Sequence, residues 1–333
     1  MKITLFGTQP YDRESFDRIR DAYGFDVTYH RSHLNAGNVA LAEGADVVCI
    51  FVNDTADAAT VARLSQLGVR LIALRCAGFN NVDLLSAAQH GIPVVRVPAY
   101  SPHAVAEHAV ALMLSLNRKI HRAYWRTRDG NFSLHGLLGF DLYGKTAGIV
   151  GTGRIARELI RILRGFGMEV IAYDLCPDEA YAAAAGIAYV PLDELYARAD
   201  IVSLHCPLTD RTRYMIGPEA IGRMKPGVML INTGRGQLIH TGALIDGLKQ
   251  KKIGAAGLDV YEEEAAYFYE DTSDRIMDDD ILARLLSFNN VIVTSHQGFF
   301  TREALDNIAR TTMENIREFA AGEPLTNRVS AGA

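Results

Sequence analysis

Three side chains in the second half of the chain, Arg235, Glu264 and His296, have the complementary chemistry needed to bind a small carboxylate and to donate a proton to another group of the same molecule. Arg235 stands between two glycines, so a short loop holds its guanidinium, which can bind a carboxylate through two parallel hydrogen bonds. His296 can donate a proton near neutral pH. Glu264 can orient that imidazole and stabilise its protonated form.

These side chains form one site only if the fold brings them together, and the pattern of predicted strands indicates that it does. Arg235 and His296 each follow an apolar run typical of a buried parallel strand, and Glu264 comes shortly after Asp259, which closes a third run. Ligands of open parallel sheets bind beyond the carboxyl ends of the strands, where all of these residues fall. The three runs are 228–232, 254–259 and 291–294.

A glycine turn near the middle of the chain predicts a dinucleotide site at the same edge. Gly151, Gly153 and Ala156 have the spacing of a Gly-x-Gly-x-x-Gly/Ala turn, between an apolar run at 145–150 and a helical pattern at 154–167. Gly151 permits the tight turn, and Gly153 lets the backbone approach a pyrophosphate. The free N–H groups and the dipole of the helix N-terminus favour that charge.

Asp174 indicates which dinucleotide binds. It follows the next predicted strand, 170–173, and can accept hydrogen bonds from both ribose hydroxyls of NAD, whereas it would repel the 2′-phosphate of NADP. The residues after it, Leu, Cys and Pro at 175–177, include no arginine to offset that repulsion.

With NAD as hydride carrier, the site suits reduction of a 2-keto acid. Arg235 would hold the carboxylate and polarise the carbonyl, and His296 would protonate its oxygen.

The composition is that of an ordinary globular protein. Its 333 residues correspond to about two domains of roughly 150 residues, and 49% of them are hydrophobic. The net charge of −5 provides no electrostatic reason to bind nucleic acid or an anionic membrane. No apolar run approaches the ~18 residues of a membrane span. A strand pattern starts at the first residues, so we expect no signal peptide. Four scattered cysteines predict reduced thiols and a cytoplasmic location.

Strand and helix patterns alternate along the chain, which predicts an α/β fold with mainly parallel sheets. The segment 97–102 interrupts the alternation with two prolines, and Ser101 is expected to cap a long helix that continues to about Arg128. Further strands are expected at 2–6, 46–52, 70–75, 93–97 and 201–205. Further helices are expected at 11–23, 57–67, 83–90, 192–198, 218–224, 241–251, 279–286 and 302–321.

Several longer motifs make the chain resemble the D-isomer-specific 2-hydroxyacid dehydrogenases, and within them the fermentative D-lactate dehydrogenases. The similarity spans nearly the whole chain. The matching stretches are RCAGFNNVD at 75–83, VRVPAYSP at 95–102, YGKTAG at 143–148, SLHCPLT at 203–209, GLDVYE at 257–262 and HQGF at 296–299.

The resemblance implies roles for individual residues. Arg235, Glu264 and His296 match the family's catalytic trio, with His296 as the proton donor. The implied NAD contacts are Gly151, Gly153, Arg154, Ile155, Asp174, Cys206, Pro207, Thr212, Thr233, Gly234 and Asp259, of which Asp259 would meet the nicotinamide carboxamide. The implied substrate contacts are Ala77, Gly78, Tyr100, Arg235, His296 and Phe299.

The family's architecture is also implied. It consists of two Rossmann- or flavodoxin-like parallel-sheet domains, with an NAD-binding domain at 101–298 inserted into a discontinuous substrate domain made of 1–100 and 299–333. The resemblance further implies a homodimer or homotetramer, with the long helix after the proline-rich segment in the interface.

Three positions depart from the usual family pattern. Ala156 replaces a glycine, which we expect to leave NAD binding intact but somewhat looser. His240 replaces an aspartate beyond the catalytic arginine, and we expect only a structural effect. Gly298 is smaller than the usual alanine, and we expect it to widen the substrate pocket slightly.

The favoured function is therefore NAD-dependent reduction of pyruvate to D-lactate. A larger 2-keto acid, phenylpyruvate-like or branched, is the alternative within the enzymes, and the pocket around Tyr100 and Phe299 decides between them. An NAD(H)-sensing binding protein, like the transcriptional corepressors of the same fold, is the alternative outside the enzymes. We expect no metal site, because His103 and His108 lack the spacing of three or four residues that ligands on one helix face require.

Overall fold

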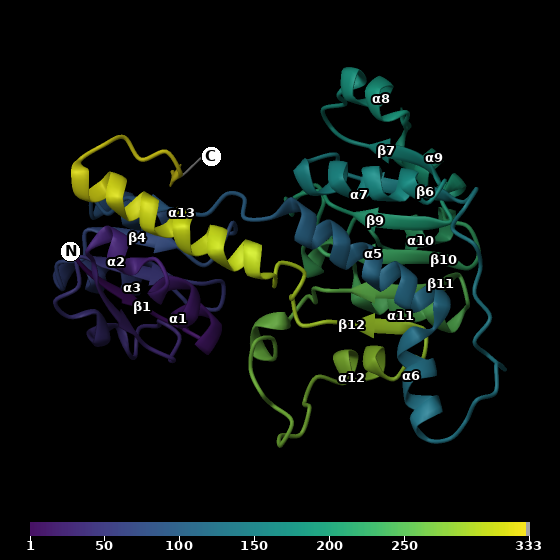
Figure 1. The fold of residues 1–333 in the computed structure, drawn as a ribbon, viewed down its shortest axis with the longest axis horizontal. Helices are drawn as coiled ribbons and strands as arrows, with labels where there is room; N and C mark the ends of the chain where they lie inside the picture. Colours follow the sequence, from purple (N-terminus) through teal and green to yellow (C-terminus); the bar gives the residue numbers. More distant parts are fainter. Residues whose placement is uncertain (331–333) are drawn as a thin grey trace. The chain divides into compact units, whose positions relative to one another are not determined.

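The computed structural model describes residues 1–330 and divides into two compact units. One unit comprises residues 1–101 together with the chain from Phe300 onward, and the other comprises Pro102–Phe299. The second unit is thus inserted in the sequence of the first (Figure 1). Each unit is built on one sheet of mainly parallel strands with helices, which confirms the predicted α/β class.

The sheet of the first unit has the strand order β13-β5-β4-β3-β1-β2, in which all pairs are parallel except β13 with β5. Its central strands are apolar and buried throughout, because helices cover both faces. Side chains of α3 and α4 pack on one face and those of α1 and α13 on the other. The strands are β1 (Lys2–Leu5), β2 (Asp26–Tyr29), β3 (Val47–Ile50), β4 (Leu71–Leu74), β5 (Val94–Val95) and β13 (Arg328–Val329). The helices are α1 (Pro10–Asp17), α2 (Arg20–Tyr23), α3 (Ala58–Gln66), α4 (Leu84–Gln89) and α13 (Arg302–Ala321), with a 3₁₀ turn η1 (Val39–Ala42).

The sheet of the second unit has the strand order β12-β11-β10-β9-β6-β7-β8, and every pair in it is parallel. All carboxyl ends therefore lie at one edge. The strands are β6 (Thr146–Val150), β7 (Glu169–Tyr173), β8 (Ala188–Tyr189), β9 (Ile201–Leu204), β10 (Val228–Asn232), β11 (Ile253–Leu258) and β12 (Val291–Val293). The helices are α5 (Pro102–Arg118), α6 (Ile120–Arg128), α7 (Arg154–Gly165), α8 (Glu179–Ala185), α9 (Leu192–Arg198), α10 (Pro218–Arg223), α11 (Thr241–Lys249) and α12 (Asp280–Leu286). Two 3₁₀ turns are η2 (Gly236–Leu238) and η3 (Glu264–Ala266).

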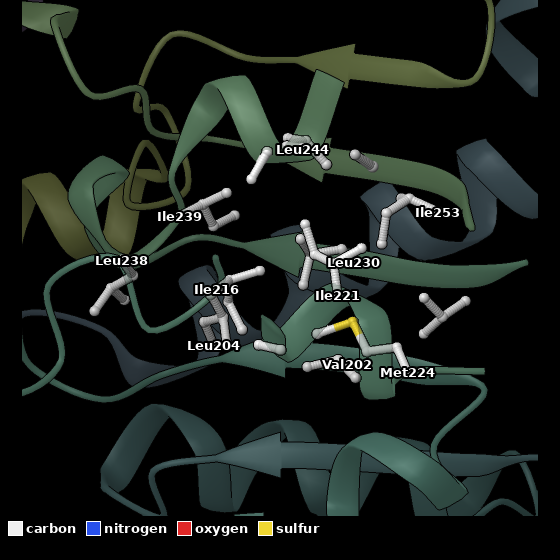
Figure 2. Close-up of a cluster of buried hydrophobic side chains, with 14 of the residues drawn as sticks. Val202, Leu204, Ile216, Ile221, Met224, Leu230, Leu238, Ile239, Leu244 and Ile253 are labelled. Carbon is white, nitrogen blue, oxygen red and sulfur yellow. The ribbon is translucent and has the colours of Figure 1, made fainter. Parts of the chain in front are cut away.

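Two apolar cores hold this second sheet between its helices. Buried side chains of α5 and α7 form the core on one face. Those of α9, α10 and α11 form the core on the other, where Leu244 and Ile221 meet Leu230 and Ile253 (Figure 2). Gly148 in β6 permits this packing, because a Cβ there would lie 2.6 Å from a methyl carbon of Leu195.

The long helix expected from Pro102 to about Arg128 is two helices, which corrects that prediction. Lys119 has a left-handed backbone with φ of 55°, and this ends α5 and starts α6 in a new direction. The buried stripe of α5 runs only as far as Leu116 and Asn117, whereas α6 has no buried residue and Ile120 is 56% exposed. Burial therefore supports a continuous helix no further than the end of α5.

Sequence patterns also missed several short elements. The strand β2, the α8–β8 pair and the edge strand β13 had no prediction. The strands β8 and β13 have two residues each, too few for a period to emerge, β2 has no buried residue, and α8 buries only Ala182. The expected helix over 11–23 is divided into α1 and α2.

His240 caps α11, since its Nδ1 accepts the N–H of Ala243 at 3.1 Å, which is a structural role. Among residues 1–330, no helix combines the length and the apolar character needed to cross a bilayer.

Candidate active site

The carboxyl edge of the β6–β12 sheet carries every chemical group predicted for that half of the chain. The glycine turn follows β6, Asp174 follows β7, the Arg235 loop follows β10, and Asp259 and His296 follow β11 and β12 (Figure 1). Because all of these strands are parallel, their ends face the same way. The groups therefore lie at one edge of the sheet, as the predicted strands indicated.

The glycine turn after β6 presents an open backbone. Gly151 has φ of +89°, and a Cβ there would lie 2.7 Å from the amide nitrogen of Cys206, so no other residue fits. Gly153 precedes the first residue of α7 and has no side chain to cap it, and a Cβ there would meet no protein atom within 4 Å. The amides of Arg154 and Ile155 lie in the first turn of α7, at the positive end of its dipole, and the space beside Gly153 is open, which suits an anion. Ala156 is fully buried in the α5–α7 core.

Asp174 lies beside this turn as a carboxylate. Its Oδ2 accepts the N–H of Thr152 at 2.7 Å and the Thr152 hydroxyl at 2.8 Å, and its Oδ1 accepts the N–H of Cys176 at 3.0 Å. Burial acts to raise the pKa of Asp174, but these hydrogen bonds outweigh it and the pKa is lowered. A charged, half-exposed carboxylate next to the anion site is what the ribose of NAD requires.

The loop after β9 contains three of the expected NAD contacts, Cys206, Pro207 and Thr212. The Thr212 hydroxyl donates to the carbonyl of Pro207 at 2.7 Å and thereby closes the loop. Burial raises the pKa of the Cys206 thiol to about 11, so this group is neutral near pH 7. His205 points elsewhere, with its Nε2 2.8 Å from Ser203 Oγ, and burial lowers its pKa to about 4. Neither group is therefore charged in the loop.

The Arg235 loop is held by Asn232, the buried last residue of β10. Asn232 Nδ2 donates to the carbonyl of Arg235 at 2.9 Å, and its Oδ1 accepts the N–H of Gly234 at 3.0 Å. The guanidinium Nη1 donates to the Gly234 carbonyl at 2.8 Å. Thr233 Oγ1 is buried with no hydrogen-bond partner among the described residues. An unpaired buried hydroxyl at this edge fits a dinucleotide that would supply its partner.

His296 and Glu264 form a direct pair. His296 Nδ1 lies 2.8 Å from Glu264 Oε1, and the two side chains are 18% and 24% exposed. Glu264 is itself oriented, because its Oε2 accepts the N–H of Tyr261 at 3.0 Å. Tyr269 donates its hydroxyl to the His296 carbonyl at 3.1 Å. With Nδ1 engaged by the carboxylate, Nε2 is the ring nitrogen that can exchange a proton with a ligand.

The backbone of His296 has a left-handed conformation, with φ of 54°. Such a conformation costs roughly 1–2 kcal/mol for a residue other than glycine. Asp259 holds it in place, because its carbonyl accepts the N–H of His296 at 2.8 Å. The Asp259 carboxylate also accepts the N–H of Gln297 at 2.9 Å and that of Gly298 at 2.7 Å.

Asp259 lies in the interior, and its position explains both how few further partners it can take and why position 298 is a glycine. Its side chain is 1% exposed, and Oδ1 also accepts from Thr294 Oγ1 at 2.5 Å and lies 3.2 Å from His108 Nε2, so only Oδ2 has room for another donor. A Cβ at Gly298 would lie 2.8 Å from Asp259 Oδ2. The small Gly298 thus accommodates the carboxylate, and a wider substrate pocket stays a prediction.

Three of the expected substrate residues lie in the other unit or at its boundary. In the loop after β4, Arg96 Nη1 donates to the Ala77 carbonyl at 3.0 Å, and the Cys76 thiol contacts the Gly78 carbonyl at 3.3 Å. The Tyr100 carbonyl accepts from Asn307 Nδ2 at 2.8 Å. Phe299, in the second unit, is 7% exposed.

Sequence reasoning missed three residues that organise the site. Asn232 has a recognisable pattern, since a polar residue that closes a buried apolar strand must have internal partners. His108 lies three residues after Val105 and four before Leu112, so it shares the buried face of α5, yet it was considered only as a metal ligand. Thr294 has no distinguishing pattern. Within residues 1–330, no group of His, Cys, Asp and Glu side chains could hold a metal ion.

Comparisons with known proteins identify the family that the chain resembles. The family model described as D-isomer specific 2-hydroxyacid dehydrogenase, NAD binding domain, matches residues 110–298. The 2-hydroxyacid dehydrogenase homolog of Haemophilus influenzae is 52% identical over 329 residues, 99% of each chain. The D-lactate dehydrogenase of Escherichia coli is 47% identical over 329 residues, 99% of this chain and 100% of that protein. The solved structure of the pyruvate reductase of Chlamydomonas reinhardtii has a TM-score of 0.93 at 47% identity and covers 98% of each chain.

The Arg235 loop yields a prediction that separates its two glycines. A Cβ at Gly236 would lie 2.1 Å from the backbone carbon of Tyr261, whereas at Gly234 the nearest atom is 3.5 Å away. Gly236→Ala must therefore shift backbone and is expected to lower the free energy of unfolding by about 1–3 kcal/mol, as overpacking does. Gly234→Ala, the matched control, should stay within about 1 kcal/mol of the unsubstituted protein. Urea unfolding measures both, and equal stabilities would contradict the close approach of this loop to Tyr261.

Proposed function

The chain belongs to the D-isomer specific 2-hydroxyacid dehydrogenases, which are NAD-dependent enzymes, and from that premise we propose that it reduces pyruvate to D-lactate with His296 as proton donor. The observation that carries the proposal is the 2.8 Å pair of His296 and Glu264 at the carboxyl edge of the sheet, one strand from the end of β11 and two from the Arg235 loop. A proton donor oriented at Nδ1 by a carboxylate suits transfer to a carbonyl oxygen.

NAD is held by groups that the glycine turn and its neighbours supply. We assign the pyrophosphate to the amides of Arg154 and Ile155, and the adenosine ribose to Asp174. The remaining NAD contacts that we propose are Gly151, Gly153, Cys206, Pro207, Thr212, Thr233, Gly234 and Asp259. When bound, NAD carries the hydride that the reaction moves to or from the substrate carbon.

The side chains of the trio have distinct tasks in this proposal. Arg235 binds the substrate carboxylate through its planar fork and polarises the carbonyl. The imidazolium of His296 donates the Nε2 proton to the carbonyl oxygen as negative charge develops there, and the Glu264 carboxylate stabilises the charged ring beforehand. We also assign the amides of Ala77 and Gly78 to the substrate carboxylate and the side chains of Tyr100 and Phe299 to the substrate pocket.

We propose pyruvate rather than a larger 2-keto acid as the substrate, because similar proteins are named a D-lactate dehydrogenase and a pyruvate reductase. We further propose that the NAD-binding domain, predicted at 101–298, is the unit Pro102–Phe299, and that the other unit is the substrate domain. The homodimer or homotetramer and the cytoplasmic location stay predictions from the sequence.

The proposed function is tested by steady-state kinetics with a series of 2-keto acids. NADH consumption is measured with pyruvate, 2-oxobutyrate, 2-oxoisocaproate and phenylpyruvate, and the product is resolved by chiral chromatography. We expect kcat/KM for pyruvate to exceed that for phenylpyruvate by about 10-fold or more, since a pocket matched to a methyl group excludes larger substituents. A higher kcat/KM with a larger acid, or L-lactate as product, would contradict the proposal.

The role of Arg235 is tested by Arg235→Lys. A lysine keeps the charge but loses the bidentate fork, and one charge-assisted hydrogen bond of about 1.5–3 kcal/mol corresponds to an about 10- to 100-fold lower kcat/KM for pyruvate. Arg223→Lys is the matched control, because Arg223 forms an exposed pair with Asp193 and should leave the rate unchanged. Equal kcat/KM in Arg235→Lys and the parent enzyme would remove Arg235 from the site.

The role of Glu264 is tested by Glu264→Gln. An amide keeps the size of the side chain but lacks the charge that orients and stabilises the imidazolium of His296. At neutral pH we expect kcat/KM for pyruvate to fall within the about 10²–10⁴-fold that a positioned proton donor contributes. Glu263→Gln, at the exposed neighbouring position, should keep the parent rate, and equal rates for both variants would refute the pair.

A further inference from the structure

His108 lies on the buried face of α5 and contacts the segment that carries His296. Its Nε2 is 3.0 Å from Thr294 Oγ1 and 3.2 Å from Asp259 Oδ1, and its side chain is 16% exposed. Thr294 and Asp259 come from the ends of two neighbouring strands, β12 and β11. One imidazole therefore joins a helix to both strand ends beside the site.

The hydrogen bonds around this imidazole determine where its proton lies. The Thr294 hydroxyl has one proton, and it donates that proton to Asp259 at 2.5 Å. Thr294 Oγ1 and the Asp259 carboxylate can then only accept from His108, so Nε2 carries a hydrogen. His108 is thus a donor to a carboxylate that has almost no contact with solvent.

The carboxylate that receives this hydrogen bond is the anchor of the segment Thr294–Gly298. It accepts the N–H groups of Gln297 and Gly298, and the carbonyl of Asp259 accepts that of His296. Gly298 packs closely against Asp259 and His108, because a Cβ at position 298 would lie 2.8 Å from Asp259 Oδ2 and 3.4 Å from His108 Cδ2. Displacement of the carboxylate would therefore move the backbone on both sides of His296.

We infer that His108 is a positioning residue, which holds the Thr294–Gly298 segment, and with it the catalytic imidazole of His296, through the Asp259 carboxylate. His108 does not touch the substrate in this inference, which rests on the proposed role of His296. Two effects contribute. The hydrogen bond fixes the rotamer of Asp259, and it favours the ionised carboxylate, which alone can accept from both amides at once.

The charged groups around His108 support this assignment. Asp259 is the carboxylate in contact with it from the β11 side, and His296 is the titratable group of the segment after β12. On α7, which also packs against α5, Glu158 pairs with His103 at 3.2 Å instead. Burial acts to raise the pKa of Asp259, but hydrogen bonds from His108, Thr294 and the Gly298 amide outweigh it and the pKa is lowered.

The inference predicts a specific pH effect for His108→Leu. A carboxylate whose pKa is lowered organises its surroundings above that pKa and ceases to do so as pH falls through it. Loss of the His108 donor raises that pKa, so the decline of kcat/KM on the acid side should begin at a higher pH than in the parent enzyme. We also expect kcat for pyruvate to fall by about 10- to 100-fold, since a displacement of about 1 Å in a reacting group has that effect. KM for NADH should change less than kcat, because Asp259 is the one group assigned to NAD that His108 contacts.

Two further variants separate positioning from packing. His108→Gln keeps a donor that can reach Asp259 and should recover most of kcat, with an acid-side decline between those of the parent and His108→Leu. His103→Leu removes an exposed histidine of the same helix and should behave as the parent. If His108→Leu does not fold, the acid-side decline of His108→Gln decides alone. Parent kinetics in both His108 variants, or equal losses in both with an unmoved acid-side decline, would overturn the inference.

Hydrogen exchange tests the inference independently of turnover. The amides of Gln297 and Gly298, which donate to Asp259, should exchange about 10-fold faster in His108→Leu, because local opening of the segment becomes easier. Amides within α7 should be unaffected. If the parent enzyme reduces no 2-keto acid, the proposed function fails while faster exchange still supports the anchoring role. Unchanged exchange at Gln297 and Gly298 overturns that role even in an active enzyme.

Discussion

The Asp259 carboxylate lies where α5 meets the ends of β11 and β12, and the arrangement of the site depends on its hydrogen bonds. A buried carboxylate without partners would be strongly destabilising. Here Thr294, His108 and two backbone amides supply four donors, so the charge is accommodated and a segment of irregular backbone becomes rigid. That rigidity keeps His296 in a left-handed conformation that it would not adopt alone.

The two chemical halves of the site are organised differently. The half that we propose to bind the nucleotide consists largely of backbone, because the space beside Gly153 at the start of α7 is open and Asp174 is hydrogen-bonded to the turn there. The half that we propose to move the proton consists of side chains, each held by a second group. Tyr261 holds Glu264, Glu264 holds His296, and Asn232 holds the Arg235 loop. The first arrangement suits binding of a charged group, and the second suits a reaction that needs exact side-chain placement.

Much of the fold and of the site could be predicted from the sequence, for a physical reason in each case. The strands β6, β10 and β11 are buried on both faces, so their apolar runs stand out, and parallel pairing then places the groups that follow them at one edge. The predictions failed where burial provides no pattern. The break at Lys119 follows the last buried turn of α5, and the two-residue edge strands β8 and β13 have no period.

The sequence by itself determined the chemistry that is present: a glycine turn with Asp174, an arginine between glycines, and a glutamate and a histidine near strand ends. These follow from local spacing and residue type, which the chain contains without folding. Only the tertiary structure decided which groups are partners. Glu264 and His296 are 32 residues apart, and His108 and Thr294 are 186 residues apart. Contacts over such separations depend on strand order and helix packing, so no local pattern could assign Gly298 to the space beside Asp259 or His108 to the segment that carries His296.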